Sequence, residues 1–162
     1  MRTISSLLLV ILFALSACSL EEETGPAEVR WDVDTCARCV MAVSDRYFSA
    51  QIRGGPADSR TKVYKFDDIG CAVIWLDEQA WKDDPRTEVW VNDHRTGDWI
   101  DARQASYVEG LVTPMAYGLG AQSEAVTDGL DFAAASKHIY QVEETSHKHR
   151  GHKMMDHGEG QE

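Results

Sequence analysis

The sequence predicts an α+β protein made of two small, consecutive ββα-like units. Two pairs of β-rich runs occur along the chain, and a short segment of turn-forming residues separates the two runs of each pair. Each pair is followed by residues whose apolar positions recur at helical spacing. The chain has 162 residues, of which 43% are hydrophobic, and this suits one domain or two small ones. We therefore expect a folded α+β domain over residues 31–142.

The first unit is expected over about residues 31–82. Its strands are predicted at 46–54 and 62–67, and the Gly-, Pro-, Asp- and Ser-containing loop between them indicates a hairpin. A helix should follow, because the next stretch carries apolar residues at helical spacing: Ile69, Ala72, Val73 and Leu76. Asp67 or Asp68 is the expected N-cap, since a carboxylate there accepts from the first free amides.

The second unit is expected over about residues 83–142. Strands are predicted at 87–93 and 98–102, on either side of an HRTG turn. A short helix is predicted at 102–110, where Gly110 would end it. Pro114 and Gly118 then break regular structure, and a helical pattern resumes over 123–137.

The N-terminus has the form of a bacterial lipoprotein signal. Residues 1–17 contain one early arginine and an apolar stretch too short to span a bilayer, which is typical of a secretory signal peptide. The sequence LSAC resembles a lipobox, which predicts cleavage before Cys18 and lipidation of its thiol; the alternative is an ordinary signal peptide cut after Ala17. Residues 18–30 are polar and acidic and are expected to be a lipidated tether.

The C-terminal segment, residues 143–162, has no apolar periodicity and is mostly charged, so we expect a disordered tail. Imidazole and thioether groups are concentrated in it, which makes it a candidate accessory site for copper or nickel. The groups concerned belong to His147, His149, His152, Met154, Met155 and His157.

The composition and the motifs narrow the function classes. The formal net charge of −11 argues against nucleic acid or anionic lipid as the main partner, because both are polyanions. No Ser/His/Asp set, Gly-rich phosphate loop or paired-carboxylate signature is evident, so the sequence does not predict an enzyme.

The stretch TCARCVMAV carries the main chemical signal. Cys36 and Cys39 form a C-x-x-C pair, but the expected helix start of a redox motif is missing after the first cysteine. A zinc site would need two more ligands, for which Cys71 and either His94 or His138 are candidates without the expected spacing. Cys71 falls early in a predicted helix among apolar residues, so a buried structural thiol is the favoured interpretation.

A soft-metal site is the remaining interpretation. If residues 39–43 are extended, Cys39 and Met41 point to one face, and a thiolate with a thioether is a combination selective for Cu(I). Met115 lies in a Pro/Gly loop rather than on an apolar helix face, which makes it a second candidate thioether ligand. Cys36 would lie nearby as a less certain ligand. With Cys18 lipidated, three thiols remain, so at least one stays unpaired within the chain.

Together these features resemble the NosL family of envelope lipoproteins. The resemblance rests on the lipobox, the motif C-x-x-C-x-M, and the stretches YFSAQI, FDDIGC, VWVNDHRTGDWIDA and LVTPMAYGLGA, in that order along residues 34–135. It implies a fold of two ββα units similar to part of the organomercurial lyases. It also implies a chaperone that binds one Cu(I) through Cys39, Met41 and Met115, with Cys36 less certain.

The resemblance further implies a partner and a location. The chaperone would deliver copper to a membrane maturation complex and, through it, to nitrous oxide reductase. It would be held by acylated Cys18 on a bacterial membrane facing the periplasm, with Ser19 favouring the outer membrane over the inner. Two alternatives stay open, namely a structural zinc-binding lipoprotein and a thiol-dependent lyase that uses Cys71 with Asp68.

Overall fold

The structure is a computed structural model that describes residues 23–156, with the backbone alone described for residues 147 and 149–156. It has mixed α+β architecture with antiparallel sheets, which confirms the predicted class. The elements, in chain order, are β1 (Ala50–Gly54), β2 (Lys62–Phe66), α2 (Ile69–Asp77), β3 (Glu88–Asn92), β4 (Trp99–Asp101), β5 (Ser106–Val108), β6 (Gly120–Gln122) and α3 (Phe132–Asp156).

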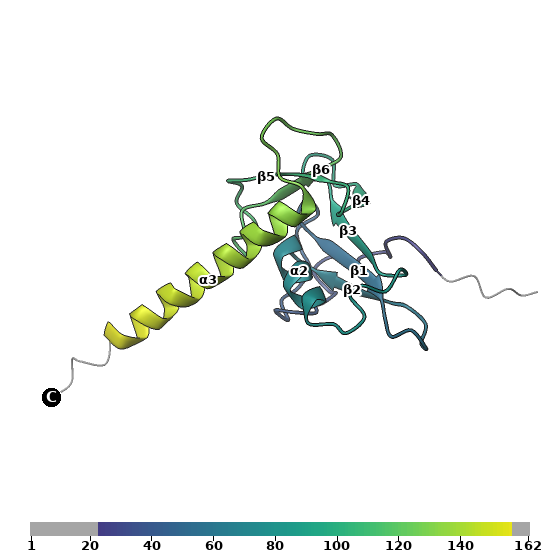
Figure 1. Cartoon of the computed structure of the whole chain (residues 1–162), viewed down its shortest axis with the longest axis horizontal. Coiled ribbons are helices and arrows are strands. Elements are labelled where there is room, and N and C mark those ends of the chain that lie inside the picture. The colour runs from purple at the N-terminus through teal and green to yellow at the C-terminus, as the bar shows by residue number, and fades with distance from the viewer. Residues whose placement is uncertain (1–22, 157–162) are drawn as a thin grey trace, which may run out of the picture.

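A four-stranded antiparallel sheet in the order β2-β1-β3-β4 forms the centre of the molecule, and β5 and β6 form a separate antiparallel pair. Helix α2 packs against β1 and β2, and α3 packs against α2 and β5. The C-terminal half of α3 extends away from the rest of the molecule (Figure 1). One edge of the structure therefore brings together α2, α3 and the loops that precede β1 and β6.

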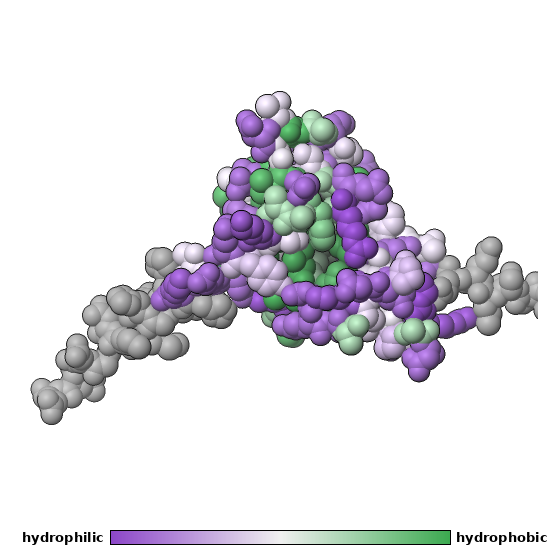
Figure 2. Space-filling view, in the orientation of Figure 1, coloured by the Kyte–Doolittle hydropathy of each residue, from purple (hydrophilic) through white to green (hydrophobic). Residues whose placement is uncertain are grey.

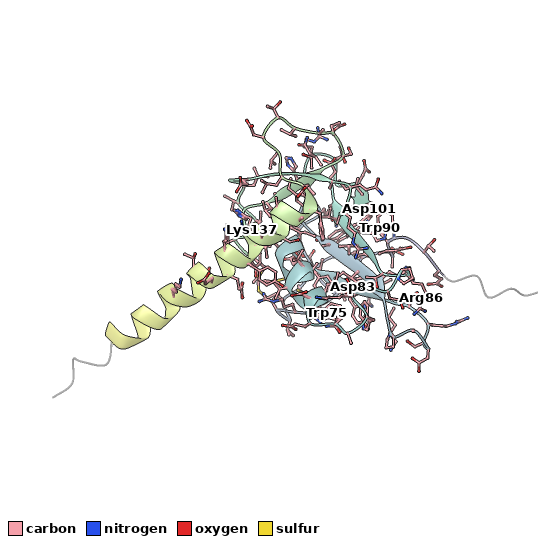
Figure 3. The ribbon with its side chains drawn as sticks, viewed as in Figure 1. Trp75, Asp83, Arg86, Trp90, Asp101 and Lys137 are labelled. Atoms are coloured by element: carbon pink, nitrogen blue, oxygen red, sulfur yellow. The ribbon has the colours of Figure 1, made fainter. Side chains whose placement is uncertain are left out.

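The first predicted unit is present as β1, β2 and α2. The two strands pair antiparallel from Ala50 opposite Phe66 to Gly54 opposite Lys62, which confirms the hairpin. Asp68 caps α2, since its side chain accepts from the amide of Gly70. The helix buries nearly all its apolar residues, and its Trp75 (labelled in Figure 3) packs against Tyr64 in a tilted arrangement with 4.4 Å between ring centroids.

The second predicted unit is not a separate ββα unit. Strands β3 and β4 were predicted with the correct turn, but β3 pairs with β1 and extends the first sheet. The helix predicted at 102–110 is wrong, because this stretch forms a turn and then β5. Tyr107 in β5 is fully buried and donates its hydroxyl to the carbonyl of Ala102 at 2.7 Å. Pairing with the distant β6 therefore outweighs the local helical tendency.

Helix α3 begins later and ends later than its predicted pattern. Residues 123–131 form a mostly exposed loop, in which Asp128 has a positive φ of 65°. Asp131 then starts the helix by accepting from the amide of Ala134 at 2.8 Å. The helix continues through Asp156, so residues 143–156 are helical where a disordered tail was predicted.

Part of the predicted tether belongs to the fold. Gln51 and Arg53 on β1 are buried polar residues on the face of the sheet that α2 does not cover, and such groups need hydrogen-bond partners. The backbone of residues 25–27 supplies them: Gln51 exchanges two hydrogen bonds with Ala27, and Arg53 donates to the carbonyl of Gly25. Residues 25–27 therefore lie on the sheet, and Val29 just after them is buried.

Several predictions fall on residues outside the described range. These are the signal peptide 1–17, the lipidated Cys18, and His157 in the tail. Within residues 23–156, neither helix is both long and apolar enough to cross a membrane.

Candidate metal centre

The cysteine loop, residues 36–41, is a tight turn. The amide of Cys36 donates to the carbonyl of Met41 at 2.8 Å, and the amide of Val40 donates to the carbonyl of Cys36 at 3.1 Å. Val40 has a φ of 64°, which is a strained conformation for a β-branched residue. The expectation of an extended segment at 39–43, with Cys39 and Met41 on one face, is therefore wrong. The turn instead brings Cys39 back toward Cys36.

Three sulfur atoms converge at this loop. Those of Cys36, Cys39 and Cys71 all lie within 4.8 Å of one another, and none of these cysteines is in a disulfide. Cys71 lies in the first turn of α2 and is fully buried, as predicted, but its sulfur belongs to the cluster. Cys36 is also buried, whereas Cys39 is half-buried. Three thiols so placed can hold a metal ion.

The loop favours a thiolate at Cys36. A hydrogen bond from the Cys71 thiol, supported by the backbone amides of Cys39, Asp67 and Arg38, lowers the pKa of Cys36 to about 5. Burial raises the pKa of Cys39, and the amide of Met41 partly opposes this effect. The neighbouring Cys36 thiolate, followed by burial, raises the pKa of Cys71. These shifts favour a thiolate at Cys36 beside protonated thiols at Cys39 and Cys71.

Arg38 closes the inner side of the centre. Its guanidinium lies 4.0 Å from the sulfur of Cys71 and donates to the Tyr117 hydroxyl at 3.0 Å and to Glu143 of α3 at 2.7 Å. The Tyr117 hydroxyl also donates to Glu143 at 2.6 Å. The ring of Tyr117 lies directly against Gly70, where a Cβ atom would be 2.2 Å away. A cation and an aromatic ring thus lie beside the thiols, and they connect the cysteine loop with α3.

Two adjacent aspartates hold the loops to the start of α2. Asp67 Oδ1 accepts from the amides of Ser44 and Asp45, just beyond the cysteine loop. Asp68 accepts from Thr113 and from the amide of Met115 in a second loop. Burial raises the pKa of Asp68, and these donated hydrogen bonds oppose the shift. The capping pair predicted from the sequence therefore also fixes the position of both loops.

The two candidate methionine ligands occupy different environments. Met41 lies at the outer edge of the cysteine loop with 52% of its surface exposed. Met115 is half-buried and packs against the core from its own loop. The remaining candidates in the tail, His147, His149, His152, Met154 and Met155, lie on the part of α3 whose side chains are not described.

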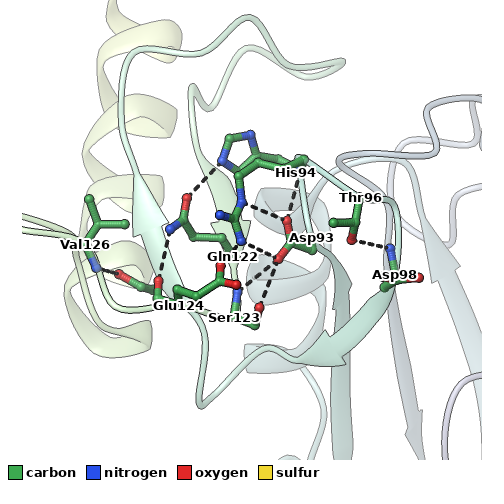
Figure 4. A network of polar contacts seen from close by, with 10 residues as sticks. Asp93, His94, Thr96, Asp98, Gln122, Ser123, Glu124 and Val126 are labelled. Carbon is green, nitrogen blue, oxygen red and sulfur yellow. Dashed lines mark hydrogen bonds and ion pairs between the residues drawn. The ribbon is translucent and has the colours of Figure 1, made fainter.

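The two histidines considered for a zinc site are engaged elsewhere. His94 Nε2 lies 3.3 Å from Gln122 Oε1, next to a network in which buried Asp93 binds Arg95 and Ser123 (Figure 4). His138 lies between Glu109 and the carbonyl of Tyr117. Among the described side chains, no histidine or carboxylate joins the three cysteines at ligand spacing.

A groove away from the cysteines lies beside α3. Apolar side chains gather in a hollow beside α3 (Figure 2), where Val73, Leu76 and Phe132 line a groove of about 330 Å³. Its polar rim includes an ion pair between Lys82 and Asp77. The cysteines do not line this groove.

Comparison with models of known protein families finds no match, and neither does a search of curated proteins. The chemistry of the centre must therefore be inferred from its own geometry. The sequence indicated Cys71 as a candidate third zinc ligand but favoured a structural thiol, and it did not identify Arg38, Tyr117 or Glu143 as neighbours of the centre. No local signal points to Arg38, Tyr117 or Glu143, because their contacts join segments far apart in the chain.

Proposed function

We propose that the protein is a copper carrier that binds one Cu(I) at Cys36, Cys39 and Cys71 and gives it to a recipient. The observation that carries this proposal is the convergence of three thiol sulfurs within 4.8 Å. Thiolate ligands select soft metal ions such as Cu(I), and Cu(I) accepts a low coordination number. The thioether of Met41 or Met115 is the proposed fourth ligand, which a ligand of the recipient would displace.

The number of ligands favours Cu(I) over structural zinc. Structural zinc sites are closed and have four protein ligands, whereas the described side chains offer three cysteines and no histidine or carboxylate at ligand spacing. A three-sulfur centre leaves room for a fourth ligand from elsewhere. The buried thiols hold the ion, and the open position permits exchange.

The exposure of the centre supports transfer from one side. Arg38, Tyr117 and Glu143 cover the inner side. On the outer side Cys39 is half-buried, and Val40 and Met41 are exposed. A ligand of the recipient can therefore approach Cys39 without opening the core, which is what delivery by ligand exchange requires.

The proposed pathway of this carrier rests on the resemblance of the sequence to the NosL family. We propose that acylated Cys18 anchors it to a bacterial membrane, facing the periplasm and favouring the outer membrane. Its recipient would be the membrane complex that matures the copper centres of nitrous oxide reductase. In this proposal the protein transfers a metal ion and catalyses no reaction of its own.

A Cu(I) competition titration tests the metal centre. The mature protein with Cys18→Ser, which leaves only the three thiols of the centre, is titrated anaerobically against a chromophoric Cu(I) chelator. We expect one tightly bound Cu(I), and a loss of at least about 100-fold in affinity for Cys36→Ser, Cys39→Ser and Cys71→Ser. This exceeds the 10–100-fold typical of residues that only support a ligand.

Val33→Ser is the matched control, because Val33 is an exposed residue of the same segment. If Cys71→Ser binds Cu(I) as tightly as the parent, the three-cysteine centre is wrong. X-ray absorption of the Cu(I)-loaded protein then separates the ligand types. A sulfur first shell supports the centre, a nitrogen first shell indicates the histidine-rich tail, and preferential retention of Zn(II) during purification would favour a zinc protein.

A further inference from the structure

Asp68 makes more hydrogen bonds than its role as an N-cap requires. An N-cap needs one side-chain oxygen to accept from a free amide of the first turn, and Oδ1 does so from Gly70 at 2.9 Å. The other oxygen, Oδ2, accepts from the hydroxyl of Thr113 at 2.7 Å and from the amide of Met115 at 3.1 Å. The side chain is 1% exposed. One carboxylate therefore binds two segments more than 40 residues apart in sequence.

The loop bound by Asp68, residues 113–118, has internal hydrogen bonds that fix the position of Thr113. Thr113 also accepts from the amide of Gly118 through its hydroxyl and from the amide of Ala116 through its carbonyl. Ala116 has a φ of 60° and Gly118 a φ of 75°, so the chain reverses sharply after Met115. The Thr113–Gly118 loop is therefore closed on itself by Thr113 and attached to α2 by Asp68.

The same loop is pressed against α2 at a second point. The ring of Tyr117 lies on Gly70 and its hydroxyl bonds Arg38 of the cysteine loop. Asp68 caps α2 and Cys71 lies in its first turn, so both residues are at the same end of the helix. The backbone amide of Met115 is thus fixed at the end of α2 that carries Cys71, and the Met115 side chain is half-buried against the core.

We infer that Asp68 is a positioning residue that holds the Met115 thioether at the three-cysteine centre as a further ligand for Cu(I). The inference rests on the proposed function and names what completes the site. A neutral thioether is a weaker ligand than a thiolate, so it can stabilise bound Cu(I) and still be displaced by a ligand of the recipient.

A double-mutant cycle tests the inference in the Cys18→Ser protein. Asp68→Asn keeps an N-cap oxygen for the amide of Gly70. Its side-chain NH2 group would face the backbone N–H of Met115, and because both groups are donors the loop loses this hydrogen bond. We expect Asp68→Asn and Met115→Leu each to weaken Cu(I) binding about tenfold, within the range for residues that orient a ligand. Asp68→Asn should then cost no more than about twofold in the Met115→Leu background, because the two residues act through one contact.

A spectroscopic readout separates positioning from general stability. With [13C]methyl-labelled methionine, Cu(I) should shift the Met115 methyl resonance in the parent and leave it unshifted in Asp68→Asn. Asp68→Ser is the second variant, since serine caps the helix but is too short to hold the loop. Asp93→Asn is the matched control: it removes another buried carboxylate with several donors, and it should lower stability without changing Cu(I) affinity or the Met115 resonance.

Three results would overturn the inference: an unchanged affinity in Asp68→Asn, an equal loss in the Met115→Leu background, or no effect of Met115→Leu itself. Each of these leaves the copper carrier standing, provided that Cys71→Ser abolishes tight binding. If Cys71→Ser has no effect, the proposed function fails first. The two failures are therefore distinguishable.

Discussion

Gly70→Ala should destabilise the protein through one specific clash. A Cβ atom on Gly70 would lie 2.2 Å, 2.4 Å and 2.5 Å from three ring atoms of Tyr117. Carbon atoms in contact are about 3.5–4.0 Å apart, so the ring would have to move by more than about 1 Å. Tyr117 is only 3% exposed, and its hydroxyl is bonded to Arg38 and Glu143. The ring therefore cannot move without disturbing its packing or breaking the hydrogen bonds of its hydroxyl group.

The size of the effect follows from these contacts. Overpacking a buried site costs about 1–3 kcal/mol, and weakening a hydrogen bond to a charged group adds about 1.5–3 kcal/mol. Alanine is the better helix former by no more than about 1 kcal/mol, which offsets part of the loss. We expect Gly70→Ala to lower the free energy of unfolding by about 2–4 kcal/mol. Urea denaturation followed by tryptophan fluorescence measures it.

A second variant reverses the sign. In a Tyr117→Ala background the clash is absent, so Gly70→Ala should stabilise the protein by up to about 1 kcal/mol through helix propensity alone. The reasoning is refuted if Gly70→Ala destabilises both backgrounds equally, because its cost would then come from somewhere other than Tyr117.

Three further predictions concern charge and backbone strain. The pKa of Cys36 is lowered to about 5 and the pKa values of the other two thiols of the centre are raised, so Cu(I) binding should release about two protons. In chelator competition, the apparent association constant for Cu(I) should therefore rise about 100-fold per pH unit between about pH 6 and 8. An association constant that does not change with pH would contradict the thiolate centre. Val40→Gly should raise the free energy of unfolding, measured by thermal unfolding, by about 0.5–1 kcal/mol. Glycine relieves about 1–2 kcal/mol of strain in the left-handed conformation, which exceeds its entropy cost of about 0.5–1 kcal/mol. Val40→Ala should raise the free energy of unfolding by less. Lys65 holds the pKa of buried Asp34 well below its ordinary value of 3.8, so the stabilisation by this carboxylate is present above that value and is lost as the pH falls below it. Asp34→Asn should therefore cost about 1–3 kcal/mol at neutral pH, and a cost that persists undiminished in acid would count against the ion pair.

The predictions that succeeded concern structure that neighbouring residues decide. The β1–β2 hairpin and the Asp68 cap depend on a turn and on the first turn of a helix, and both are visible within a dozen residues. The helix predicted at 102–110 failed because Tyr107 becomes buried through pairing with β6, which lies more than ten residues further along the chain. The tether failed in part because Gln51 and Arg53, in a distant strand, need the backbone of residues 25–27.

For the candidate metal centre, too, local sequence predicted the chemical groups but not their arrangement. The C-x-x-C-x-M stretch indicated thiol and thioether chemistry before any fold was known, since residue type alone sets which metals a side chain prefers. The expected geometry was wrong, because the positive φ of Val40 turns the chain between Cys39 and Met41. No spacing rule links Cys36 to Cys71, because the β1–β2 hairpin lies between them and its folding sets their distance.

By itself, the sequence predicted the α+β class, the β1–β2 hairpin, the cap of α2 and the presence of thiol groups suited to a metal ion, all of which follow from side-chain chemistry and from contacts within a few residues. Tertiary structure alone decided which thiols meet, that Arg38 and Glu143 close one side, and that Asp68 holds the Met115 loop against α2. The physical reason is that these contacts join segments far apart in the chain. Their geometry depends on how the sheet, the two helices and the loops pack together, which local propensity does not encode.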